Sequence, residues 1–327
     1  MNIALVAPII FPVPSPAYGG VEAVLANLSA RLCDLGHTVT LYAKKGSRPD
    51  PRVRVVEIEA EASAFTEDLL AADVVHMHGW DAPAFWAFAE AHPDRRFVQT
   101  WHGPSMGNTA PPANVTVCGV SHWHAWSLSA ELGVECVGVP NGIHLDDYPL
   151  YEGKREPFLL SLNRLDPAKG IHRAIVVAKV AGMQLRIAGP EHGVPDPEYV
   201  RTILSRCDGE RVVYEGNLGL EDKVHLLQRA TAVLGLGDWA EPFGLFAVEA
   251  NACGTPVLAL ARGALPEVLR GGGGKALLEI DHKDDAGRFL ALPSFYCRPL
   301  KCRANAERFT DAIMARRYEE VYARAQA

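Results

Sequence analysis

The chain has no long hydrophobic run and no strongly basic segment. Its 327 residues carry 32 Lys and Arg against 39 Asp and Glu, a net charge of -7, and no basic block is longer than a pair. This charge balance argues against a nucleic-acid partner. The start, MNIALVAPIIFPVP, lacks a basic stretch, a small-residue cleavage site and about 18 consecutive apolar residues, so it predicts neither secretion nor membrane spanning. We expect a cytoplasmic protein without stable membrane insertion.

Cysteine pairs and common metal motifs are also absent. The seven cysteines include no Cys-x-x-Cys pair, which predicts reduced structural thiols rather than a metal or disulfide framework. There is no H-E-x-x-H segment. His76 and His78 do have a His-x-His spacing, but we expect two such side chains on a strand to point to opposite sides or to straddle a core. We therefore predict no metal site and no cofactor.

The sequence does contain an alternation of β-branched runs and helical patterns, which is typical of parallel sheets with helices on both faces. The expected strands are 2–7, 38–43, 53–58, 73–78, 97–101 and 115–120, and then 158–163, 183–189, 211–216, 231–237 and 255–261. Prolines, glycines and charges at 140–157 separate the two series and indicate an interdomain connection. We read GGGG at 271–274 as a flexible loop. The pattern predicts two α/β domains, with ligands binding beyond the carboxyl ends of the strands and in the cleft where the domains face one another.

Two expected loops carry groups suited to an anion. Gly19 and Gly20 stand where the loop after the first strand turns into a helix, and free N–H groups there can bind an anion, although a plain tight turn would also use two glycines. Arg164 and Lys169 follow the first strand of the second domain. The two cations can converge on one phosphate group, or they can be ordinary solvated charges of a surface loop.

The segment AEPFGLFAVEA at 240–250 places two acids eight positions apart. Glu241 lies in a loop at the carboxyl end of an expected strand, and Glu249 lies about one turn inside the following helix. The two could be an acid/base pair, a clamp for sugar hydroxyls or solvated charges at a helix start. A helix-start acid explains Glu249 well, because the helix dipole stabilises a carboxylate there. It does not explain Glu241 beside a Pro-Phe-Gly bend. His102, directly after an expected strand, is the best histidine candidate for chemistry in the cleft.

Taken together, these segments resemble the retaining GT-B glycosyltransferases of family 4. The resemblance rests on the glycine pair at 19–20, R-x-x-x-x-K-G at 164–170, IAGPE at 187–191, E-P-F-G-x-x-x-x-E-A at 241–250 followed by A-C-G-T-P-V, and GALPEVL at 263–269. The motifs extend in order over most of the chain. The glutamate segment with its Gly-Thr-Pro-Val tail and GALPEVL are the most specific of them.

The resemblance implies transfer of a sugar from a nucleotide diphosphate-sugar donor to an acceptor hydroxyl, with retention at the anomeric carbon and no required metal. By similarity, Gly19, Gly20, Arg164 and Lys169 hold the diphosphate. Gly189, Asn217 and Leu218 line the nucleoside pocket, and Glu249 binds the ribose. Glu241, with the backbone of Phe243, Gly244 and Leu245, faces the donor sugar, and His102 approaches that sugar from the first domain. The acceptor is expected to be a glycan, a lipid-linked molecule or a small molecule.

The resemblance also implies a domain plan and leaves alternatives. Residues 1–148 would form the acceptor-side Rossmann-like domain and 149–305 the nucleotide-sugar-binding Rossmann-like domain, while 306–327 would form a helix crossing back toward the first. Three positions depart from the family pattern: Asn163 replaces a Gly, His144 replaces an Asp, and GDW precedes Glu241 where a Ser is frequent. A noncatalytic sugar-nucleotide-binding protein and a GT-B sugar-nucleotide epimerase remain as alternatives. A dinucleotide dehydrogenase would need a G-x-G-x-x-G turn, which the first loop lacks.

Overall fold

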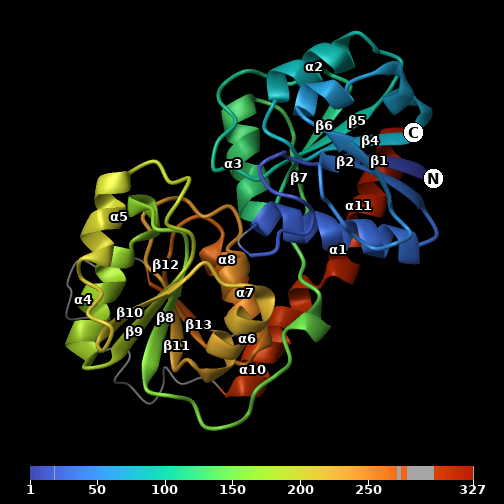
Figure 1. Cartoon of the computed structure of the whole chain (residues 1–327). Coiled ribbons are helices and arrows are strands. Elements are labelled where there is room, and N and C mark those ends of the chain that lie inside the picture. The colour runs from blue at the N-terminus through green and yellow to red at the C-terminus, as the bar shows by residue number, and fades with distance from the viewer. Residues whose placement is uncertain (18, 271–273, 278–297, 327) are drawn as a thin grey trace. The chain divides into compact units, whose positions relative to one another are not determined.

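The computed structural model describes residues 1–17, 19–270, 274–277 and 298–326. Contacts within the chain divide it into two compact units, Met1–His144 with Phe309–Ala327, and Leu145–Arg308. We call them unit 1 and unit 2 and describe each by itself (Figure 1). No helix in the described ranges is long and apolar enough to cross a membrane.

Unit 1 is built on a seven-stranded parallel sheet with the order β3-β2-β1-β4-β5-β6-β7. Its strands are β1 Asn2–Val6, β2 Thr38–Lys44, β3 Arg54–Ile58, β4 Val74–Met77, β5 Phe97–Trp101, β6 Val115–Gly119 and β7 Val137–Gly138. The helices are α1 Gly20–Asp34, α2 Ala82–Glu90, α3 His122–Leu132 and α11 Asp311–Gln326, with short 3-10 turns at Glu61–Ala64 and Glu67–Ala71. All six strands expected in this part of the chain are confirmed. The sequence did not predict β7, since two residues carry no periodicity.

The last helix, α11, completes the core of unit 1. It packs against α1 and is drawn in red beside the blue elements of this unit in Figure 1. Tyr318 and Tyr322 of α11 are fully buried. The hydroxyl of Tyr322 lies 2.8 Å from Nδ1 of His76, and the hydroxyl of Tyr318 lies 2.9 Å from Oγ1 of Thr100. These contacts fix the C-terminal helix to β4 and β5, so the two ends of the chain share one core.

The expectation for His76 and His78 was wrong. Their ring centroids are 4.0 Å apart, and both side chains are fully buried. Side chains two positions apart along an extended segment lie on the same face, so the two rings meet. Burial lowers the pKa of both imidazoles well below its usual value. The pair is therefore neutral and belongs to the core.

Unit 2 is built on a six-stranded parallel sheet with the order β10-β9-β8-β11-β12-β13. Its strands are β8 Phe158–Leu162, β9 Gln184–Ala188, β10 Val212–Gly216, β11 Ala232–Gly235, β12 Val257–Leu260 and β13 Gly274–Leu277. The helices are α4 Ile171–Ala181, α5 Pro197–Leu204, α6 Leu220–Arg229, α7 Leu245–Ala252, α8 Leu265–Val268 and α10 Pro299–Ala306, with 3-10 turns at Leu145–Asp147 and Pro167–Lys169. A further 3-10 turn, Glu307–Phe309, begins in unit 2 and ends on the first residue of the C-terminal part of unit 1. The five expected strands are confirmed. The reading of GGGG as a loop was wrong for Gly274, which begins β13, and residues 271–273 lie outside the described ranges.

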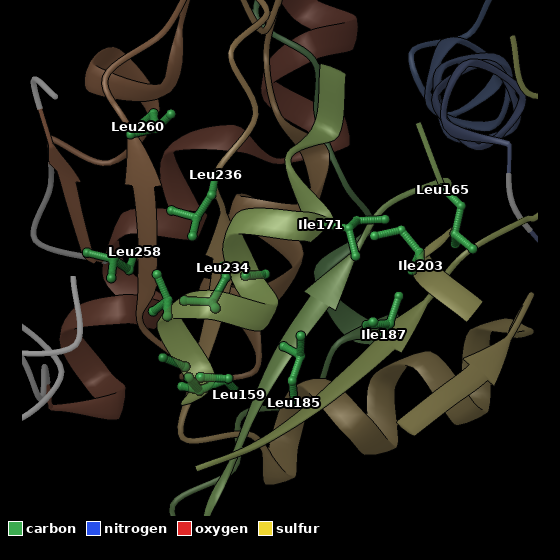
Figure 2. Packing of buried hydrophobic residues seen from close by; sticks show 14 of the residues in the cluster. Leu159, Leu165, Ile171, Leu185, Ile187, Ile203, Leu234, Leu236, Leu258 and Leu260 are labelled. Carbon is green, nitrogen blue, oxygen red and sulfur yellow. The ribbon is translucent and has the colours of Figure 1, made fainter. Parts of the chain in front are cut away.

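Branched aliphatic side chains form the core of unit 2. Leu159, Leu185, Ile187 and Leu234 come from three neighbouring strands, and Ile171 comes from the start of α4 (Figure 2). Their side chains are at most 1% exposed. Because the core fixes β8 beside β11, the loops at the carboxyl ends of these two strands are held next to each other.

Candidate functional site

The loops after β8 and β11 are in close backbone contact. Gly170 has a positive φ of 69°, and a side chain there would clash with the carbonyl oxygen of Leu236. A Cβ on Gly237 would lie 2.5 Å from the carbonyl oxygen of Ala168, and the N–H of Asp238 donates to that oxygen at 3.1 Å. Only glycine allows the two backbones to approach this closely. This contact brings the side chains of the two loops close together.

Lys169 and Glu241 form a buried ion pair across these loops. Nζ of Lys169 donates to Oε2 of Glu241 at 2.9 Å, with side-chain exposures of 9% and 15%. Trp239 completes the group. Its Nε1–H donates to the same oxygen at 2.6 Å, and its ring centroid lies 3.5 Å from Nζ of Lys169. A small pocket opens here, lined by Asn163, Lys169, Gly235, Gly237, Trp239, Glu241, Phe246 and Leu265.

Arg164 lies in the same loop as Lys169. Its Nη2 donates to Oδ2 of Asp166 at 3.1 Å, and its Nε is buried with no hydrogen-bond partner among the described residues. Burial lowers the pKa of Lys169, Glu241 opposes that shift, and the positive charge of Arg164 adds to it. The two cations thus influence one another, and an anion held by both would relieve their repulsion.

Glu249 has a different set of partners. Its Oε1 accepts from the hydroxyl of Tyr148 at 2.8 Å and from Nζ of Lys223 at 2.8 Å. Burial raises the pKa of Tyr148 well above its usual value, and the nearby Glu249 carboxylate raises it further. Each acid of the glutamate segment therefore has its own lysine, Lys169 for Glu241 and Lys223 for Glu249. Such a division does not resemble two carboxylates sharing one proton.

Gly244 separates the two acids structurally. It is the N-cap of α7 with a φ of 93°, a left-handed conformation that suits glycine. Phe243 before it is buried, and Leu245 after it is half-buried. The N–H of Ala264 donates to the carbonyl oxygen of Glu241 at 2.8 Å, which ties the acid's backbone to the segment before α8. The bend therefore leaves Glu241 in the loop and Glu249 in the helix, as the sequence predicted.

The residues expected at the nucleoside lie at the ends of β9 and β10. Gly189 has a φ of 149°, and a side chain there would clash with the carbonyl oxygen of Asn163. Its N–H donates to the carbonyl oxygen of Gly216 at 2.8 Å. Asn217 is exposed and Leu218 half-buried, directly after that glycine. The structure therefore brings Gly189 close to the chain segment that carries Asn217 and Leu218.

Three of the predicted residues belong to unit 1. Gly19 is the N-cap of α1, and Gly20 begins that helix. A Cβ on Gly19 would lie 2.9 Å from Oε2 of Glu22, a buried acid whose pKa burial raises to about 7. His102 follows β5, and its Nε2 lies 3.0 Å from Nδ1 of His78. Burial lowers the pKa of His102 to about 3, so the ring is neutral near pH 7.

The sequence did not predict the partners of the acids and of His102. Trp239 could have been singled out from the sequence, since it is the only tryptophan between residues 145 and 308. Lys223, Tyr148 and His78 carried no such signal, because each meets its partner only through the fold.

Two family models match the chain. "Glycosyltransferase Family 4" matches residues 18–147, and "Glycosyl transferases group 1" matches residues 149–288. A phosphatidyl-myo-inositol mannosyltransferase of Propionibacterium freudenreichii subsp. shermanii is 27% identical, covering 82% of this chain and 79% of the relative. The solved structure of AviGT4, described as a glycosyltransferase involved in avilamycin A biosynthesis, is 28% identical with a TM-score of 0.81, covering 100% of this chain and 98% of AviGT4. Anabaena HepE, solved in complex with UDP and glucose, has a TM-score of 0.77 at 16% identity, covering 99% of each chain, and shows the fold.

Two parallel α/β sheets with helices, matched over their full length by solved glycosyltransferases, define a protein of the GT-B class. Together the two family models span most of the chain. With the solved structures, they support a glycosyltransferase of group 1 and family 4. The predictions of a GT-B architecture and of a glycosyltransferase are confirmed.

Proposed function

We propose that the protein transfers a sugar from a nucleoside diphosphate-sugar donor to an acceptor hydroxyl, with retention at the anomeric carbon and without a required divalent ion. The observation that best supports this is the buried pair of Lys169 and Glu241 in the pocket beyond β8 and β11. Ligands of open parallel sheets bind at this edge. A buried cation beside a buried acid provides one group for a phosphate and one for sugar hydroxyls.

Arg164 and Lys169 are proposed to bind the diphosphate. Cleavage of the bond between sugar and diphosphate leaves growing negative charge on the leaving oxygen, so cations fixed in advance accelerate that step. Two charge-assisted contacts of about 1.5–3 kcal/mol each would contribute on the order of 3–6 kcal/mol, a factor of about 10² to 10⁴ in rate if they act in the transition state. Supply of this charge by the two side chains is the basis for proposing metal independence. We include Gly19 and Gly20 as further diphosphate contacts.

The remaining assignments rest on the family resemblance together with the contacts of these side chains. Glu241, with the backbone of Phe243, Gly244 and Leu245, is proposed to orient the donor sugar. Glu249 is proposed to bind the ribose through its second oxygen, since Tyr148 and Lys223 both use Oε1. Gly189, Asn217 and Leu218 are proposed to line the nucleoside pocket.

His102 is proposed to act on the donor sugar. As a neutral imidazole it can donate or accept a hydrogen bond at neutral pH. His102→Ala should lower turnover by about 10² or more, the size typical of a positioned catalytic side chain. The variant's affinity for a nucleoside diphosphate should remain at the wild-type value, because the proposed diphosphate cations are in unit 2.

The central test combines binding and product analysis. Nucleoside diphosphates are screened by thermal stabilisation, where a ligand at 100 times its dissociation constant adds about 2.7 kcal/mol. Turnover is then followed by NMR of the anomeric proton, with polyol, lipid-linked and saccharide acceptors offered in turn. The proposal expects a product with the donor's anomeric configuration, formed equally well in excess chelator. An inverted product would contradict retention, and a loss of activity restored by a divalent ion would contradict metal independence.

The same experiment separates the alternatives. A noncatalytic sugar-nucleotide-binding protein would bind donor and never transfer the sugar to an acceptor or to water. An epimerase would convert the donor into a second sugar form without consuming any acceptor. The glycosyltransferase proposal expects consumption of donor and acceptor in equal amounts.

A further inference from the structure

Trp239 contacts both Lys169 and Glu241 in the pocket beyond β8 and β11, where the donor is proposed to bind. Its indole face lies 3.5 Å from Nζ of Lys169, and its Nε1–H donates to Oε2 of Glu241 at 2.6 Å. Lys169 donates to the same oxygen at 2.9 Å. The ammonium, the carboxylate and the indole therefore contact one another in all three pairs.

The backbone around Trp239 is fixed from several sides. Arg173 of α4 donates to the carbonyl oxygen of Leu236 at 3.1 Å and also binds the carboxylate of Asp238. Gly237 fits against the loop of Lys169 only because it has no side chain. The loop that presents the indole is thus tied to the helix that follows Lys169. An indole held in this way can define the direction of a flexible lysine side chain.

An indole suits this position for an electrostatic reason. A lysine ammonium has three N–H donors, and Lys169 uses one of them on Glu241. The ring face attracts the cation through its quadrupole but carries no negative charge, so it does not compete with a phosphate for the positive charge. A second carboxylate in its place would give the group a net negative charge and repel a diphosphate. The indole also covers the ammonium against water, which strengthens its interaction with a bound anion.

We propose that Trp239 is a positioning residue for both ends of the donor. Through its ring face it directs the Lys169 ammonium toward the diphosphate, and through Nε1–H it directs the Glu241 carboxylate toward the donor sugar. The inference rests on the proposed function of these two side chains and adds a residue that acts through them.

Two substitutions separate the two contacts. Trp239→Phe keeps an aromatic face but removes the Nε1–H donor, so it should leave nucleoside diphosphate affinity within about 3-fold and lower kcat about 10-fold or more, the effect of losing a hydrogen bond to a charged group. Trp239→Leu removes both contacts. It should lower kcat as the Phe variant does and also weaken nucleoside diphosphate binding by about 3-fold to 30-fold.

Trp86→Phe is the matched control. The Nε1–H of Trp86 donates to Oε1 of Gln99 at 2.7 Å in unit 1, so this variant loses an indole hydrogen bond of similar length outside unit 2. We expect its kcat and its nucleoside diphosphate affinity to match the wild type. If the loss of any tryptophan lowered kcat, Trp86→Phe and Trp239→Phe would show the same decrease.

Fluorescence gives a readout that does not depend on turnover. Since Trp239 is the only tryptophan in unit 2, the difference between wild-type and Trp239→Phe emission reports on this indole. Movement of the Lys169 ammonium toward a diphosphate should change that emission on titration with UDP, ADP and GDP. The Phe variant should bind the same diphosphate without the change.

The outcomes distinguish this inference from the function on which it rests. If no nucleoside diphosphate binds the wild type, the proposed function fails and the inference fails with it. If the wild type binds and turns over, but both Trp239 variants keep wild-type kcat and affinity, the function stands and the inference is overturned. Equal losses of affinity in the Phe and Leu variants would overturn the proposed division between the ring face and Nε1–H. Thermal unfolding checks that each variant is folded. If Trp239→Leu does not fold, kcat and affinity of Trp239→Phe and the fluorescence titration of the wild type decide the matter.

Discussion

Nδ1 of His78 and Nε2 of His102 lie 3.0 Å apart, so one of the two neutral rings donates to the other. The second nitrogen of His78, Nε2, is buried and has no hydrogen-bond partner among the described residues. If that nitrogen carried the proton, a buried N–H would be unsatisfied, which is rarer in proteins than an unsatisfied acceptor. His78 therefore carries its proton on Nδ1 and donates to His102. This leaves the proton of His102 on its other ring nitrogen, Nδ1.

A first prediction tests this assignment. His78→Asn keeps an N–H donor near the position of Nδ1, whereas His78→Leu removes it. We expect the Asn variant to stay within about 3-fold of wild-type turnover, and the Leu variant to lose about 10-fold, the effect of one hydrogen bond of about 1.4 kcal/mol. Initial rates with donor and acceptor measure the effect. Similar rates in the two variants would show that the hydrogen bond does not orient His102.

A second prediction concerns the ion pair of Lys169 and Glu241. Both side chains are largely buried, so Glu241→Ala leaves an ammonium without its anion. Removal of one partner of a buried pair costs about 3–5 kcal/mol. We expect a loss of free energy of unfolding near the lower end of this range in urea titrations, and a smaller loss in the double variant Lys169→Met with Glu241→Leu. If the losses of the single variants Lys169→Met and Glu241→Leu simply add in this double variant, the pair is not coupled.

A third prediction separates the roles of the two acids. Glu249→Ala should weaken nucleoside diphosphate binding by about 1–3 kcal/mol, whereas Glu241→Ala should leave that affinity nearly intact and lower turnover. Lys223→Met should weaken binding in the same direction, because Lys223 orients the Glu249 carboxylate. Calorimetric titration measures all three.

The control for Lys223→Met is the same substitution at an exposed lysine of α4, Lys179. It should bind the diphosphate as the wild type does. Equal affinity losses in the Glu241 and Glu249 variants would show that the proposed division between sugar and ribose is wrong.

A fourth prediction follows from the buried histidines of unit 1. Burial lowers the pKa of His124 from 6.5 to about 4. Between these values the unfolded chain binds a proton that the folded chain does not, so the free energy of unfolding decreases as the pH falls. His124→Asn removes this dependence and should make the slope between pH 6 and pH 5 shallower by about 1.4 kcal/mol per pH unit. Urea titrations across this range measure the slope.

Glu22 should act in the opposite sense. Its pKa is raised from 4.5 to about 7, so between these values the folded chain holds a proton that the unfolded chain has lost, and its contribution to stability decreases as the pH rises. Glu22→Gln should therefore steepen the dependence on pH that His124→Asn makes shallower. Parallel stability curves for the wild type and both variants would contradict the assignment of these shifts to burial.

The sequence by itself determined the strands, the two-sheet architecture and the candidate donor segment. Eleven of the described strands have enough β-branched residues to be recognised locally, and the Pro-Phe-Gly bend separates a loop acid from a helix acid wherever the rest of the chain lies. Arg164 and Lys169 could be expected near one ligand because they stand five positions apart around a single turn. The short strand β7 and the glycine that begins β13 have no such local signal.

Only the tertiary structure decided which groups the candidate residues contact. Lys169 and Glu241 are 72 residues apart in sequence, and Tyr148 and Glu249 are 101 apart. Lys169 and Glu241 meet because hydrophobic burial sets the strand order, which places β8 beside β11, and because glycines let the loops of these strands touch. The local sequence contains the charged groups, but the partner of each depends on which strands become neighbours. Trp239 is an example. In the sequence it only departs from the family pattern before Glu241, whereas in the structure it contacts both members of the Lys169–Glu241 ion pair.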